Sequence, residues 1–260
     1  MSRGVIYLGI GESHCEEAII SAHSLKQVMP DLPVVLTTDR QVKDSCFDEV
    51  NLIDVKSYDR SFNIKLMRDS PFEQTLSLDT DTYVCGDLSE AFELLQRFDM
   101  AATLSQNATP IFRKEGAPSS FSQLNGGVLF YRDSDTMKKF FTRWLTYYEQ
   151  DCALGPKKLY PSAGAKREFV HNQPSLRQAV YESDIRLATL PLEYNCRIGW
   201  NGFLNDSVRI LHGHMPDPVL FEHQVNEYTD KRLYFKRGKN LIVKPGKVQR
   251  RIQRILNRYL

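Results

Sequence analysis

The chain of 260 residues lacks a long apolar run. No stretch of about 18 consecutive apolar residues occurs, so the sequence predicts no membrane-spanning helix. The first apolar run, Val5–Ile10, is too short for the core of a secretory signal peptide, and we interpret it as a buried strand. We therefore expect a cytoplasmic protein. The apolar fraction of 42% and the charged fraction of 25% are typical of a folded globular domain.

Cysteine is scarce and scattered. The number of cysteines is odd and no Cys-x-x-Cys pair occurs, so the sequence predicts neither a disulfide framework nor a zinc knuckle. We expect reduced and mostly buried thiols. The five residues are Cys15, Cys46, Cys85, Cys152 and Cys196.

The net charge is only +2, but the charge is unevenly distributed. Eleven of the 34 Lys and Arg residues lie between Lys231 and Leu260, where no Asp or Glu occurs. Residues 1–230 therefore carry 23 basic and 32 acidic side chains. We divide the chain into a body, residues 1–230, and a basic tail, residues 231–260.

Short apolar segments alternate with helix-length segments through the body. This alternation predicts an α/β fold with a mostly parallel sheet and helices on its faces. The expected strands are residues 5–10, 33–39, 50–55, 74–78, 101–104, 127–131, 185–190 and 208–211; the expected helices are 16–29, 61–70, 88–97, 134–151 and 173–182. Ligands of such sheets bind at the carboxyl ends of the strands. We therefore expect residues 9–11, 38–39 and 79–81 to border one crevice.

Two aspartates follow the expected strand 74–78 directly. Asp79 and Asp81 are two residues apart, and carboxylates beside a buried strand need solvent, cations or a metal ion nearby. Mg²⁺ and Mn²⁺ take carboxylate oxygens and share their coordination with substrate phosphates. The pattern fits such a metal site, and it fits a solvated loop as well.

Five motifs in sequence order resemble those of GT-A-fold glycosyltransferases, most closely glycosyltransferase family 8. They span roughly residues 4 to 216 and comprise Lys65–Leu66 with Phe72–Val84, Leu124–Tyr131, Asn172–Leu176, Leu190–Asn195 and Ile210–His214. The resemblance implies a GT-A fold and a transferase that moves a sugar from a UDP-sugar donor to a glycan or glycolipid acceptor. It also implies dependence on Mn²⁺ or Mg²⁺ and, by analogy, retention of the anomeric configuration.

The resemblance assigns roles to particular residues. Asp79, Asp81 and His212 would bind the metal ion, with His214 as a rival ligand. Asn172 and Gln173 would join the two aspartates in the catalytic set. The expected donor-binding residues lie at five places along the chain: Gly9, Ile10 and Gly11, then Asp39, Lys65, Thr80, and finally Asn125, Gly126 and Gly127.

The chain departs from the family pattern at two places. Asn172 stands where the family has an acidic residue that contacts the donor sugar. Residues 215–218 replace a Lys-Pro-Trp-like element that holds the diphosphate. The diphosphate charge must then be neutralised by another cation, and the sequence offers Lys157, Lys158, Lys166, Arg167 and Arg197. A polar stretch, residues 106–123, is expected to form a loop over the site.

The basic tail ends in residues 246–260, which form a basic amphipathic pattern of helical period. Such a helix either binds an anionic membrane surface, at the inner face of the membrane, or docks on the body. No nucleic-acid recognition module accompanies the charge.

Two alternative functions stay open. One is a catalytically silent binding protein of the same fold. The other is a nucleotidyltransferase, although residues 9–13 lack the basic residues of its phosphate loop.

Overall fold

The computed structural model describes residues 2–55, 58–106, 117–159 and 169–246. Several predicted features therefore lie outside the described residues. These are residues 107–116 of the expected loop 106–123, the cations Lys166 and Arg167, and residues 247–260 of the expected helix 246–260. Among the described helices, none is long and apolar enough to cross a membrane.

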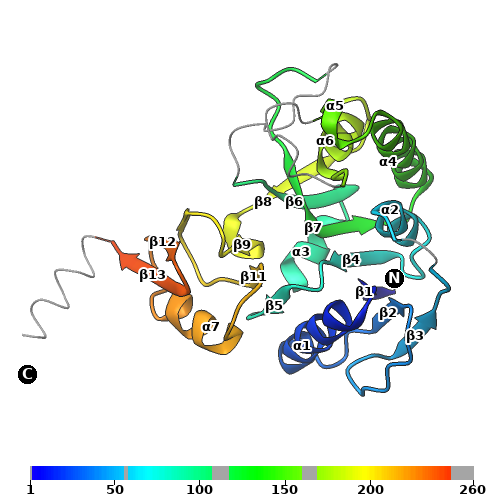
Figure 1. The fold of residues 1–260 in the computed structure, drawn as a ribbon. Coiled ribbons are helices and arrows are strands. Elements are labelled where there is room, and N and C mark those ends of the chain that lie inside the picture. Colours follow the sequence, from blue (N-terminus) through cyan, green and yellow to red (C-terminus); the bar gives the residue numbers. More distant parts are fainter. Residues whose placement is uncertain (1, 56–57, 107–116, 160–168, 247–260) are drawn as a thin grey trace, which may run out of the picture.

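A mixed, mostly parallel sheet of seven strands forms the centre of the fold, as the sequence predicted (Figure 1). Its strand order is β3 (Glu49–Leu52), β2 (Val34–Thr38), β1 (Arg3–Gly9), β4 (Gln74–Leu78), β7 (Leu124–Arg132), β6 (Met100–Leu104) and β8 (Leu187–Leu190). The first four strands run parallel to one another. β7 is antiparallel to both of its neighbours, and β8 is parallel to β6.

Helices cover both faces of this sheet. On one face, Val5 and Tyr7 of β1 pack in a core with residues of α1 (Glu12–Val28) and α3 (Ser89–Leu94). On the other face, Ile6 packs in a second core with α2 (Ser61–Arg68), α4 (Asp135–Leu154) and α6 (Gln173–Tyr181). Successive strand residues point to opposite faces, so continuous apolar strands such as β1 and β2 supply both cores. A short helix, α5 (Pro156–Leu159), follows α4.

A third core lies beside the main sheet. One small sheet has the order β5 (Thr82–Val84), β11 (Ile210–His212) and β9 (Cys196–Arg197). A second has the order β10 (Gly202–Leu204), β12 (Arg232–Arg237) and β13 (Asn240–Pro245). The 3₁₀ helix η2 (Leu192–Tyr194) and α7 (Pro218–Asn226) complete this region, which occupies the left of Figure 1.

Several expected elements begin or end at other residues in the structure, and α7 was not predicted. Three differences are informative. α1 begins at Glu12 rather than Glu16, because Gly11, with φ of 82°, ends the preceding turn in a conformation that favours glycine. β7 begins at Leu124 rather than Gly127, so it includes Asn125. The described part of the basic tail forms the β12–β13 hairpin, and its Tyr234 is buried in the third core. The division of the chain at residue 230 stays a prediction.

Candidate metal and nucleotide-sugar site

A polar cavity lies where β1 and β4 end. It has a volume of about 310 Å³, within the range of small-molecule sites. Its lining comes from β1, α1, α2, the Asp79–Asp81 turn, β7, the start of α6, and the ends of β9 and β11. The crevice expected at the carboxyl ends of the parallel strands is therefore present.

Asp79, Asp81 and His212 meet in this cavity, as the sequence analysis predicted. Nε2 of His212 lies 3.6 Å from Oδ2 of Asp79 and 3.4 Å from Oδ1 of Asp81. One ligand atom from each residue falls within 4.8 Å of the others, which is close enough for one metal ion. The pairing of β11 with β5 brings them together, because Thr82 is the register partner of His212.

A chain of side-chain amides orients His212. The oxygen Oδ1 of Asn125 accepts the backbone N–H of Gly127 at 3.0 Å, so Asn195 presents its NH₂ group to that oxygen, at 2.9 Å. The carbonyl oxygen of Asn195 then faces Nδ1 of His212 at 2.8 Å, and Nδ1 must be the protonated nitrogen. Nε2 is thus the ring nitrogen that faces the two carboxylates. Metal-binding histidines are commonly held this way.

Gly127 leaves space for the two side chains that it faces. A Cβ atom at this position would lie 2.4 Å from Oδ2 of Asp79 and 2.4 Å from Cε1 of His212. A Cβ on the neighbouring Gly126 would meet only Leu176, at 3.5 Å. The cradle therefore fits an ion with two oxygen ligands and one nitrogen ligand, a set that suits Mn²⁺ better than Mg²⁺.

Glu17 of α1 connects the two segments that carry the candidate metal ligands. Its carboxylate accepts the hydroxyl hydrogen of Thr80 at 2.9 Å and contacts Nδ1 of His214 at 2.7 Å. His14 lies 3.2 Å from the same carboxylate. His214 therefore does not join the aspartates as a rival ligand. β11 ends at His212, and Gly213, with φ of 117°, turns the chain so that His214 does not continue the strand.

The two aspartates differ in their electrostatic environment. Burial and the neighbouring Asp81 raise the pKa of Asp79 above its ordinary value. Burial also opposes ionisation of Asp81, but the adjacent His212 outweighs it and lowers the pKa of that carboxyl. The Asp79 side chain keeps 41% of its surface accessible, so a cation can reach it.

Two arginines line the same cavity, Arg60 and Arg197. Arg197 lies on β9 as the register partner of His212, and its Nε is buried without a hydrogen-bond partner. Of the five cations that the sequence offered, Arg197 alone lines the cavity among those that the structure describes. Lys157 and Lys158 are exposed on α5.

The other predicted site residues divide into two groups. Those that line the cavity are Ile10, Thr80, Asn125, Gly126, Gly127, Asn172 and Gln173. Asp39 instead accepts the N–H of Gly11 at 3.0 Å, and that hydrogen bond lowers the pKa of Asp39. Gly9 is buried at the end of β1, and Lys65 is exposed on α2 with its ammonium over the Phe62 ring. The structure does not bring Gly9, Gly11, Asp39 or Lys65 into the cavity lining.

Sequence reasoning missed several cavity residues, which are His14, Glu17, Tyr58, Arg60 and Asn63. His14 and Glu17 are spaced i, i+3 directly after the Gly-x-Gly turn, which is a signal for a shared helix face at the site. For the other three residues we find no such signal.

No protein-family model matches the chain, and no curated protein matches it in sequence. Solved structures do match. The glycosyltransferase GlyE of Streptococcus pneumoniae TIGR4 has a TM-score of 0.55 at 17% identity, over 89% of this chain and 58% of GlyE. The galactosyltransferase LgtC, in complex with donor and acceptor sugar analogues, has a TM-score of 0.54 at 12% identity, over 82% of this chain and 87% of LgtC.

Mouse xyloside xylosyltransferase 1 is similar too, with a TM-score of 0.53 at 11% identity, over 82% of this chain and 98% of the mouse protein. This chain thus spans a little over half the length of GlyE and most of the other two. At these identities the likeness concerns the fold. The chain has the fold of the GT-A glycosyltransferases, as its sequence motifs implied.

Proposed function

We propose that this protein is a metal-dependent glycosyltransferase that transfers a sugar from a UDP-sugar donor to a glycan or glycolipid acceptor. The observation that carries the proposal is the convergence of Asp79, Asp81 and His212 on the space left by Gly127. The hydrogen bond between Nδ1 of His212 and Asn195 supports it, since a histidine held in this way presents its other nitrogen to a cation.

In this proposal the two aspartates and His212 hold Mn²⁺ or Mg²⁺ against the donor diphosphate. When bound, the ion supplies Lewis-acid stabilisation of the negative charge on the leaving nucleoside diphosphate. Thr80 lies between the aspartates, and its hydroxyl bonded to Glu17 keeps that turn in place. Asn172 and Gln173 line the same cavity and are proposed to contact the donor sugar.

We assign the second diphosphate-binding charge to Arg197. The departure at residues 215–218 requires a substitute cation, and Arg197 projects from the strand next to His212. An arginine offers several N–H donors to phosphate oxygens, and Arg197 lines the cavity. Backbone contacts hold the residue in place: its N–H donates to Gln106 at 3.2 Å, and its carbonyl accepts the Tyr234 hydroxyl at 3.3 Å.

Retention of the anomeric configuration and a membrane location are further parts of the proposal. Retention follows from the family 8 resemblance alone and is checked by the anomeric configuration of the product. Binding to an anionic membrane surface depends on residues 246–260. Co-sedimentation with anionic but not neutral vesicles checks it.

The test is a donor panel. Purified protein is incubated with UDP-, GDP-, ADP- and CMP-sugars, with Mn²⁺ and with EDTA, and nucleotide release is measured. We expect slow release of UDP from one donor with Mn²⁺ only. Asp81→Asn should abolish this release and leave the circular dichroism spectrum unchanged. Asp184→Asn, an exposed carboxylate outside the cavity lining, is the matched control and should behave as wild type.

Two results contradict the proposal. Full activity of Asp81→Asn would show that the metal assignment is wrong. If no nucleotide-sugar is hydrolysed and none gives a metal-dependent thermal shift, the chain is instead the catalytically silent binding protein.

A further inference from the structure

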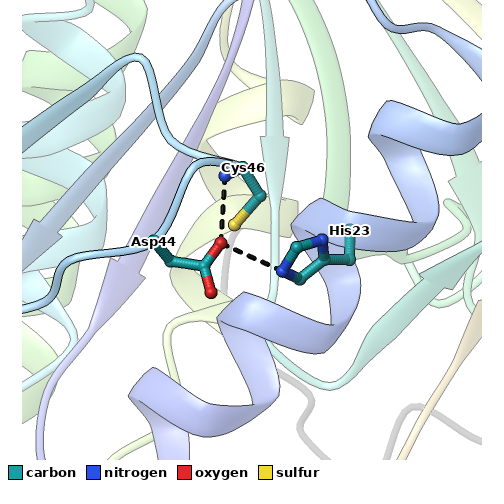
Figure 2. A group of neighbouring side chains, drawn as sticks. All are labelled: His23, Asp44 and Cys46. Carbon is teal, nitrogen blue, oxygen red and sulfur yellow. Dashed lines mark hydrogen bonds and ion pairs between the residues drawn. The ribbon is translucent and has the colours of Figure 1, made fainter.

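A second group of metal-ligating side chains lies away from the cavity, between α1 and the segment that connects β2 to β3. It consists of His23 of α1 with Asp44 and Cys46 of the connecting segment (Figure 2). Nε2 of His23 lies 2.9 Å from Oδ1 of Asp44, and the backbone N–H of Cys46 donates to the same oxygen at 3.0 Å. In Figure 2, dashed lines run from one oxygen of the Asp44 carboxylate to the His23 ring and to the backbone nitrogen of Cys46.

The ligand types define which ion this group would take. A thiolate, an imidazole and a carboxylate together supply sulfur, nitrogen and oxygen ligands, and this combination suits Zn²⁺. Mg²⁺ and Mn²⁺ prefer oxygen ligands and are not suited to a thiolate. One ligand atom from each residue lies within 4.8 Å of the others. A tetrahedral zinc ion with bonds of about 2.0 to 2.3 Å separates its ligands by roughly 3.3 to 3.8 Å. The ion pair between His23 and Asp44, at 2.9 Å, must therefore open to admit the ion between the two side chains.

We propose that His23, Asp44 and Cys46 form a zinc-binding site that is separate from the nucleotide-sugar cavity. On binding, a Zn–S bond forms as the S–H bond of Cys46 breaks, and its proton is released to solvent. The Nε2 lone pair of His23 and one Asp44 oxygen supply the next two bonds. Water takes the fourth position, reached from the side where His23 is half exposed.

Such an ion would fix the segment between β2 and β3 to α1. Residues 39–48 contain no helix or strand, and Cys46 and Phe47 are their anchors in the first core. The segment begins at Asp39, which binds Gly11 at the start of α1. The zinc site would thus connect this segment to α1 at a second point, at His23, in addition to the contact between Asp39 and Gly11. This inference does not depend on the proposed transferase activity.

Cobalt substitution tests the site, because the Asp79, Asp81 and His212 cluster contains no sulfur. The EDTA-treated full chain is titrated with Co²⁺, and thiolate-to-cobalt charge transfer is followed in the near ultraviolet. We expect one equivalent of thiolate-bound cobalt, displaced by Zn²⁺. Asp81→Asn should leave this signal intact, which separates it from the donor site. Cys152→Ser, at an exposed free cysteine, is the matched control and should also keep the signal.

Cys46→Ser should remove the charge-transfer signal. Because Cys46 is buried and its replacement could disturb folding, His23→Gln provides a second variant at a half-exposed side chain. His23→Gln should bind Zn²⁺ at least about tenfold more weakly with an unchanged circular dichroism spectrum. The proposal is overturned if wild type gives no thiolate signal with Co²⁺, if folded Cys46→Ser keeps it, or if His23→Gln binds Zn²⁺ as tightly as wild type.

Discussion

Substitution of Gly127 by alanine should damage the metal site without breaking the fold. The new Cβ would lie 2.4 Å from Oδ2 of Asp79 and from Cε1 of His212, whereas non-bonded carbon atoms pack at about 3.5 Å or more. At least one of the two side chains must therefore move by about 1 Å. Metal–ligand distances tolerate deviations of only about 0.2 Å.

The size of the effect follows from this displacement. A misplacement of about 1 Å at a reacting centre can lower the rate about 100-fold. Overpacking of this kind costs the fold only about 1 to 3 kcal/mol, and Gly127 does not have the positive φ that would add backbone strain. We expect Gly127→Ala to lose at least about 100-fold in Mn²⁺-dependent kcat/KM and to remain folded at 25 °C.

The matched control is Gly126→Ala, one residue away. Its Cβ would make an ordinary contact of 3.5 Å with Leu176, so Mn²⁺ affinity should stay near wild type. Gly126 lines the donor cavity, so the variant is a control for metal binding and not for turnover. Both variants are assayed for UDP release and for Mn²⁺ affinity by calorimetry, with thermal unfolding as the folding check. If folded Gly127→Ala binds Mn²⁺ and turns over as wild type does, the ion is not held by Asp79 and His212.

Three further predictions concern other residues. Arg197→Gln should raise KM for the UDP-sugar about tenfold or more, because one charge-assisted phosphate contact is lost, and unchanged donor kinetics would contradict the assignment. Glu17→Gln should weaken Mn²⁺ binding about 10-fold, because Glu17 holds Thr80 and His214 in the two segments that carry the candidate ligands, and Glu17→Ala should weaken it further. Calorimetry measures the affinity, and an unchanged value would refute this role. Asp99→Asn should destabilise the fold by about 1 to 3 kcal/mol at pH 7, because buried Asp99 accepts hydrogen bonds from Arg132 and Arg186. Burial opposes ionisation of Asp99, but these bonds outweigh it and lower its pKa, so its contribution is present above about pH 4 and is lost as the pH falls. Urea unfolding of both proteins should therefore converge in acid, and a constant difference down to pH 2 would refute this.

Much of the fold could be predicted because local patterns determine it. The runs that became β1 and β2 each contain several consecutive apolar residues, as expected for strands buried on both faces. Asp79 and Asp81 come just after the next parallel strand, β4. Chain order alone therefore placed the carboxylates at the edge of the sheet where ligands bind. The place of His212 came from the resemblance of its motif, and not from any local pattern.

The rest of the site depends on contacts between distant parts of the chain. Glu17 and His214 are 197 residues apart, and neither residue type nor spacing indicates that they touch. The hydrogen bond between Asn195 and Asn125 spans 70 residues and orients the amide that holds the His212 ring. The β12–β13 hairpin was missed for a different reason: its many lysines and arginines obscure the alternation of a strand, although Tyr234 is buried.

The third core is therefore part of the site and not an appendage to it. Asp79 follows a strand of the main sheet, but His212 and Arg197 belong to β11 and β9, which are held by the third core. The β12–β13 hairpin reaches the same strands through the Tyr234 hydroxyl, which accepts a hydrogen bond from the Gln106 amide at 2.6 Å and donates one to the carbonyl of Arg197. Any change that loosens this core would separate the histidine and the arginine from the aspartates while the main sheet stays folded. Loss of metal affinity without global unfolding would then be the first effect of damage to residues 232–245.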